Sequence, residues 1–95
     1  MIVHFHPEAE AEVLEARAWY AERSEIAARA FATEVAWAVR EIGSTPERWK
    51  RHEYGTRRFM LPNFPFSIIY RVHENAVQVV AMPHHRRRPG YWRSR

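Results

Sequence analysis

The spacing of apolar residues changes once along this 95-residue chain, from the period of a helix to the period of a strand. Before Gly43, apolar side chains recur every three to four residues, which is typical of helices that bury one face. After residue 56 they alternate with polar ones, which is typical of strands that lie against a core. One such switch predicts an α+β domain, in which helices and strands occupy separate parts of the chain.

Two helices are predicted in the first half of the chain. The first begins at Pro7, a residue suited to the first helical position, and extends to about Arg23. The second begins after Ser24, a good N-cap, and Gly43 ends it. The predicted buried faces consist of Ala9, Val13, Ala16 and Tyr20 in the first helix and Ala27, Phe31, Val35, Ala38 and Ile42 in the second. Because almost no loop separates them, we expect an antiparallel helical hairpin.

Four strands are predicted, over residues 2–5, 57–61, 66–73 and 76–82. Glu74 and Asn75 alone separate the last two, which indicates a tight hairpin. The order β-α-α-β-β-β predicts one layer of helices on one face of a small, mainly antiparallel sheet. The length fits one domain over residues 1–95. No helix remains to cover the other face of the sheet, so we expect chemistry or partner binding there.

Charge divides the chain into an acidic part and a basic part. Residues 1–43 hold eight Glu and four Arg, a net charge of −4. Residues 44–95 hold three Glu and eleven Lys or Arg, a net charge of +8. A polyanion or an acidic protein is therefore the expected partner of the second part, although a solvated basic surface has the same composition.

Several classes of protein are excluded by composition. The chain has no Cys, which excludes disulfides and thiol nucleophiles and suits a reducing compartment. Its longest uncharged stretch, residues 59–70, has 12 residues and two prolines, too few to span a membrane. No secretory signal opens the sequence, so we expect a cytoplasmic protein without a membrane partner. His4 and His6 share one strand face but lack an obvious third ligand, so no metal site and no cofactor are predicted.

The stretch most suited to chemistry is residues 84–92, which combines histidines, three arginines and two aromatic rings. Cleavage of an RNA backbone uses a base, an acid and a cation beside the phosphate, and an aromatic ring can hold an unstacked base. Arg58 and Arg71 lie on neighbouring strand segments and can project onto the same face. A docking segment or a solvated end is the alternative interpretation. Trp49, with Lys50 and Arg51, forms a basic loop suited to nucleic-acid contact or to pinning that loop to the core.

Taken together, these features resemble the toxins of the RelE/ParE superfamily. The residues that carry the resemblance are His6 to Glu12, Trp19-Tyr20, Ala30-Phe31, Arg57-Arg58-Phe59, Phe64 to Val72, and His84 to Trp92. Phe64-Pro65-Phe66 and Pro89-Gly90-Tyr91-Trp92 look most like the ParE-type branch, and Lys50 is the only lysine, whereas RelE-like members have more.

The resemblance implies the toxin of a bacterial type II toxin–antitoxin module, a plasmid-stabilisation protein held silent by a cognate antitoxin. RelE-like members cut mRNA on the ribosome, and we expect this mechanism here, carried out by a metal-independent endoribonuclease, because arginine beside histidine has a clear use in RNA cleavage. The alternative is non-enzymatic inhibition of DNA gyrase, as in ParE-like members. A third option is a regulatory module that binds its antitoxin and does nothing else. For the RNA-cleaving mechanism, the implied catalytic residues are His84, Arg58, Arg71 and Tyr91. The implied nucleic-acid or partner-binding residues are Lys50, Arg51, Arg86, Arg87, Arg88 and Trp92.

Overall fold

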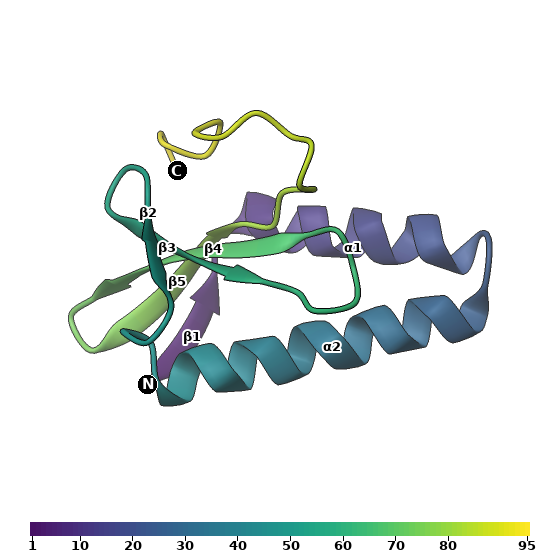
Figure 1. The fold of residues 1–95 in the computed structure, drawn as a ribbon, viewed down its shortest axis with the longest axis horizontal. Helices are drawn as coiled ribbons and strands as arrows, with labels where there is room; N and C mark the ends of the chain where they lie inside the picture. The colour runs from purple at the N-terminus through teal and green to yellow at the C-terminus, as the bar shows by residue number, and fades with distance from the viewer.

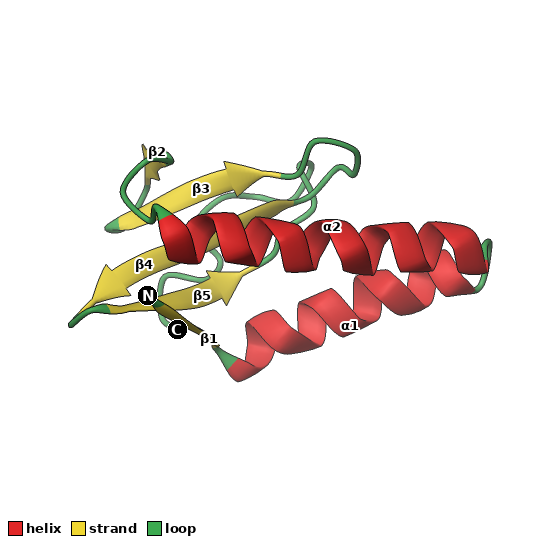
Figure 2. Cartoon of the chain, turned by 90° about the horizontal axis from the view of Figure 1, so that it is seen from below, coloured by secondary structure: helices red, strands yellow, loops and turns green.

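Two helices cover one face of a five-stranded sheet in the computed structural model, which describes all 95 residues (Figures 1 and 2). The elements are β1 (Ile2–Phe5), α1 (Pro7–Ala21), α2 (Glu25–Ser44), β2 (Lys50–His52), β3 (Thr56–Met60), β4 (Ser67–His73) and β5 (Ala76–Ala81). The strand order is β1-β5-β4-β3-β2, with β1 parallel to β5 and all other neighbours antiparallel. The predicted α+β architecture is confirmed. Neither helix combines the length and the hydropathy needed to cross a membrane.

The helices begin at the residues that the sequence indicates. Pro7 is the first residue of α1, and the Ser24 side chain caps α2 by accepting a hydrogen bond from the Ala27 amide at 3.1 Å. The predicted ends differ slightly. The first helix ends at Ala21 instead of Arg23, and the second continues one residue past Gly43, to Ser44. The carbonyl of Gly43 accepts a hydrogen bond from the Met1 amino group at 2.8 Å.

The main core lies between the hairpin and the sheet. Both predicted helical faces contribute to it, and the helices and strands meet around fully buried Phe31 and Tyr70. The rings of Tyr20 and Phe31 each pack against those of Phe64 and Phe66, and Tyr20 also packs against Phe31. The ring centroids in these pairs are 5.1–6.5 Å apart, and most pairs are edge-to-face. This aromatic cluster links both helices to the segment between β3 and β4.

The tight turn between β4 and β5 is confirmed, because Glu74 and Asn75 both have positive φ, 47° and 62°. The strand β2, in contrast, is absent from the sequence prediction, which assigned Lys50 to a loop. It pairs antiparallel with β3, placing Lys50 opposite Arg58 and His52 opposite Thr56. Three consecutive polar residues have no apolar alternation, so only the pairing itself defines this strand.

The expectation that the far face of the sheet is uncovered is wrong. After β5 the chain folds back across that face, as the yellow end of the ribbon shows in Figure 1. We call residues Pro83–Arg95 the C-terminal arm. Trp92 of the arm packs with Ile69, Val80 and Ala81 to form a second, smaller core. This packing was not predicted from the sequence, because the apolar part of the arm, Tyr91-Trp92, is too short to show a repeating pattern.

Candidate functional site

The C-terminal arm is held against the sheet and α1 by polar contacts of its last residue. The Arg95 guanidinium lies 3.0 Å from the Glu12 carboxylate, and both side chains are largely buried. It also donates to the Val80 carbonyl at 3.0 Å. In the opposite direction, Arg71 on β4 donates to the Arg95 carbonyl at 3.0 Å. These contacts fix the arm's course and therefore the shape of the two cavities beside it.

Tyr91 and Trp92 supply the apolar part of this attachment. Trp92 is 1% exposed and stacks on His52 of β2, with ring centroids 5.6 Å apart. Tyr91 is half-buried, and the Arg87 guanidinium lies over its ring at 3.8 Å. Burial raises the pKa of Tyr91, and the negative charge of Glu12 raises it further, so the phenol stays protonated near neutral pH.

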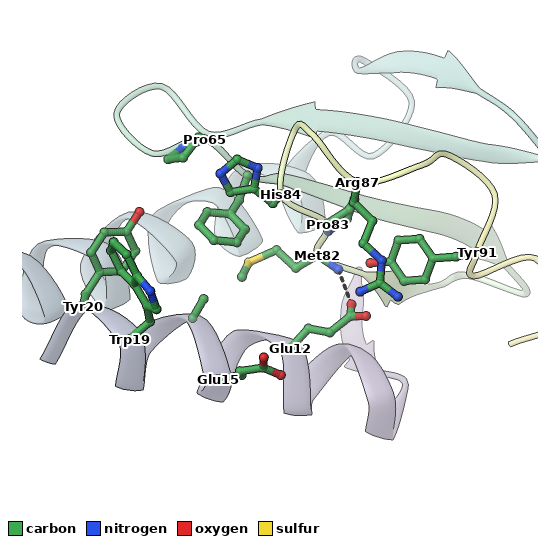
Figure 3. A pocket seen from close by; sticks show the side chains of 12 residues that line it. Glu12, Glu15, Trp19, Tyr20, Pro65, Met82, Pro83, His84, Arg87 and Tyr91 are labelled. Atoms are coloured by element: carbon green, nitrogen blue, oxygen red, sulfur yellow. Dashed lines mark hydrogen bonds between the residues drawn. The ribbon is translucent and has the colours of Figure 1, made fainter. Parts of the chain in front are cut away.

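The larger cavity, which we call the α1–arm groove, lies between α1 and the start of the arm and has a volume of about 450 Å³. Figure 3 shows Glu12, Glu15, Trp19 and Tyr20 on the helical wall, and His84, Arg87 and Tyr91 opposite them. The remaining lining residues are Ala16, Pro65, Phe66, Met82 and Pro83. The groove is therefore apolar along its floor, acidic along α1 and basic on the arm.

The smaller cavity, which we call the basic cavity, lies between the arm and the far face of β2–β4 and has a volume of about 60 Å³. Its lining residues are His52, Arg58, Ser67, Ile69, Pro83, His84, His85, Arg87, Pro89 and Trp92. Five of these are basic and none is acidic. Pro83, His84 and Arg87 line both cavities, so the two adjoin.

The pKa of His52 is lowered by its surroundings in the basic cavity. Burial lowers the pKa of His52, and the charges of Arg58 and Lys50 lower it further, while Glu53 acts in the opposite direction. Arg58 is itself half-buried, and its Nε donates to the Ser67 hydroxyl at 3.1 Å. No carboxylate forms a salt bridge with this arginine, so no acidic side chain neutralises its charge.

The four predicted catalytic residues do not meet in one place. Arg58 lines the basic cavity and Tyr91 lines the α1–arm groove, while His84 lines both. Arg71 lines a separate recess with Arg51 and is held by the Arg95 carbonyl. In His84, Nδ1 accepts the Arg86 backbone N–H at 3.1 Å, which leaves Nε2 as the ring nitrogen free for chemistry.

The predicted binding residues divide in a similar way. Lys50 and Arg51 are exposed on the edge strand β2, and Arg86, Arg87 and Arg88 are exposed on the arm. Trp92 is the residue of the arm that is buried against the sheet, so it is a packing residue and offers no free ring face to a base. His52 is a cavity residue that the sequence interpretation missed, because its place opposite Trp92 depends on the unpredicted strand β2. No three His, Asp or Glu side chains gather at the spacing of metal ligands.

Comparisons with known proteins identify the family and the fold of this chain. A family model described as "ParE toxin of type II toxin-antitoxin system, parDE" matches residues 3–89. A solved structure described as "Chromosomal ParDE TA system from P. aeruginosa" superposes with a TM-score of 0.80 at 18% identity, covering 88% of this chain and 95% of that one. No curated protein sequence matches significantly. At that identity the structural match shows a shared fold.

Proposed function

This chain belongs to the family of ParE toxins of type II toxin–antitoxin systems, and from that membership we propose that it arrests growth by binding DNA gyrase, without a reaction. In the same proposal, a cognate antitoxin protein neutralises it until the antitoxin is degraded. The family membership supports the antitoxin partner, and the geometry of the site supports a binding mechanism over a catalytic one.

The separation of the predicted catalytic residues carries this proposal. Backbone cleavage needs a base, an acid and a cation within hydrogen-bond reach of one phosphate. Here Arg71 is occupied by the Arg95 carbonyl, and the protonated Tyr91 faces a different cavity from Arg58. A toxin that acts through a surface requires no such convergence.

The basic arm is the proposed docking surface for the antitoxin. Arg86, Arg87 and Arg88 are consecutive, exposed and without an acidic partner, so an acidic antitoxin segment can cover them. Such a complex weakens as salt rises, because the charges remain near solvent. A complex insensitive to salt would instead indicate that the antitoxin docks in an apolar groove between the helices. This groove has a volume of about 370 Å³, and its lining residues are Phe5, Val13, Leu14, Arg17, Phe31, Ala32, Val35, Ala36 and Val39.

Ribosome-associated mRNA cleavage is the second candidate function, and one observation favours it. Arg58 and His84 line one small cavity that contains no carboxylate. In this alternative Arg58 binds the phosphate. Nε2 of His84 acts either as the base that removes the 2′-OH proton or as the acid that protonates the leaving oxygen.

Controlled expression without antitoxin distinguishes the two mechanisms. We expect DNA replication to stop before translation, purified protein to inhibit gyrase supercoiling, and the His84→Ala variant to remain toxic. The matched control is His73→Ala, an exposed histidine at the end of β4 that lines neither cavity. If translation stops first and His84→Ala abolishes toxicity while antitoxin binding survives, the RNA-cleaving alternative is correct.

A further inference from the structure

The basic cavity has the composition of an anion site and the size of one small ion. Its volume of about 60 Å³ compares with about 10–15 Å³ for each water molecule that a cavity can hold. It therefore has room for about four oxygen atoms, which is the number in a phosphate. A terminal phosphate leaves at most one sugar outside a cavity of this size, whereas a phosphate inside a nucleic-acid strand leaves two.

The charge and the hydrogen-bond donors of the basic cavity also favour a phosphate. Arg58 lines the cavity from β3, and Arg87 lines it from the arm, with its guanidinium over the ring of Tyr91 at the border with the α1–arm groove. No lining residue of the basic cavity carries a negative charge. Guanidinium groups are the donors best matched to the oxygens of a phosphate. Two positive charges, one of them on the half-buried Arg58, match a phosphate that ends a chain, because such a phosphate carries nearly two negative charges at neutral pH.

A second observation is independent of charge. Trp92 lines the basic cavity and is 1% exposed, and its indole N–H is buried without an acceptor. A buried donor without a partner costs about 1–3 kcal/mol, so native structures rarely keep one unsatisfied. An oxyanion in the cavity supplies the kind of acceptor that this N–H lacks.

From these observations we propose that the basic cavity binds a terminal phosphate, either free inorganic phosphate or the phosphate at the end of a nucleotide or nucleic-acid strand. Arg58 and Arg87 carry the charge interaction, and Trp92 donates one neutral hydrogen bond. The site does not depend on which target the toxin inhibits, and it lies on the protein's own fold between β2–β4 and the arm.

Calorimetric titration with inorganic phosphate, at constant ionic strength maintained with chloride, tests the site. We expect saturable binding with one phosphate per chain, accompanied by shifts of the His52 and His84 ring signals in NMR spectra. Arg58→Gln should weaken binding at least tenfold, and Trp92→Phe, which keeps a ring but removes the N–H, about fivefold. The matched control is Arg88→Gln, because Arg88 is an exposed arginine of the same arm that does not line the cavity. If Arg58→Gln unfolds, Arg87→Gln takes its place, since Arg87 is exposed.

Oligonucleotides distinguish the two sources of phosphate. Tighter binding of a 5′-phosphorylated tetranucleotide than of inorganic phosphate assigns the site to strand ends, and the reverse order assigns it to the free ion. The proposal is overturned if phosphate binding does not saturate, or if the Arg58 and Arg88 variants bind phosphate equally. A 5′-hydroxyl tetranucleotide that binds as well as the phosphorylated one excludes strand ends as the source of the phosphate. None of these measurements contains gyrase, so failure here leaves the proposed function untouched.

Discussion

Glu12 and Arg95 are joined by an ion pair of 3.0 Å although 83 positions separate them in the sequence. The side chain of Arg95 is 11% exposed and that of Glu12 is 17% exposed. The other carboxylate oxygen of Glu12 accepts the backbone N–H of Met82 at 2.9 Å. One carboxylate on α1 therefore holds both the start and the end of the segment that covers the far face of the sheet.

Replacing Glu12 should loosen the C-terminal arm. We expect Glu12→Gln to lower the free energy of unfolding by about 2 kcal/mol, because it weakens a charged hydrogen bond and leaves the Arg95 charge poorly compensated. Urea denaturation measures this loss, and hydrogen exchange should increase in residues 83–95. Glu15→Gln is the control, since Glu15 is exposed on the same helix. Equal stability of the two variants would show that the ion pair does not hold the arm.

Gly90 should tolerate substitution less well than Gly55, although both have positive φ, 86° and 70°. An added Cβ at Gly90 would lie 2.7 Å from Cε2 of Tyr54, whereas one at Gly55 meets no atom within 4 Å. We expect a destabilisation of about 1 kcal/mol for Gly55→Ala, from backbone strain alone, and a larger one for Gly90→Ala, because the exposed ring of Tyr54 must also move. Thermal unfolding of both variants provides the comparison, and similar losses would contradict it.

The parts of the fold that sequence reasoning predicts are those with a repeating apolar pattern. Phe31, Val35, Ala38 and Ile42 recur on one face of α2, and all four are buried as expected. The Glu74-Asn75 turn was likewise predictable, because two polar residues between alternating strands leave little choice of connection. Local patterns of this kind are present in any short window of the chain.

The site was less predictable because contacts between distant residues form it. Arg58 and His84 line one cavity, as expected. Arg71 lies outside that cavity and donates a hydrogen bond to the Arg95 carbonyl, and Trp92 is buried. The arm's path depends on Glu12, which lies in a different charge block of the sequence. A count of basic residues in the last part of the chain cannot reveal which of them a carboxylate on α1 holds in place.

The charge of Arg58 should be measurable at His52. The pKa of His52 is lowered from 6.5, first by burial and then by the charge of Arg58, so we expect Arg58→Gln to raise it and Glu53→Gln to lower it. A histidine with a lowered folded-state pKa stabilises the fold above its ordinary pKa. This contribution is lost as the pH falls from 6.5 through the lowered value. NMR titration of the imidazole signals measures both effects, and an unchanged pKa in Arg58→Gln would exclude the interaction.

Tyr70 should make the protein sensitive to alkaline pH. Its side chain is fully buried, its hydroxyl donates to the Pro46 carbonyl, and burial raises its pKa from 10 to about 12. The folded state thus retains a proton that the unfolded chain releases, so the stabilisation is complete below pH 10 and declines as the pH rises towards 12. Tyr70→Phe should cost about 1–3 kcal/mol at pH 8, because the buried Pro46 carbonyl loses its donor. Urea denaturation of both proteins at pH 8 and 11.5 should show this difference shrinking at the higher pH. A difference that stays constant would mean that Tyr70 titrates at its ordinary pKa.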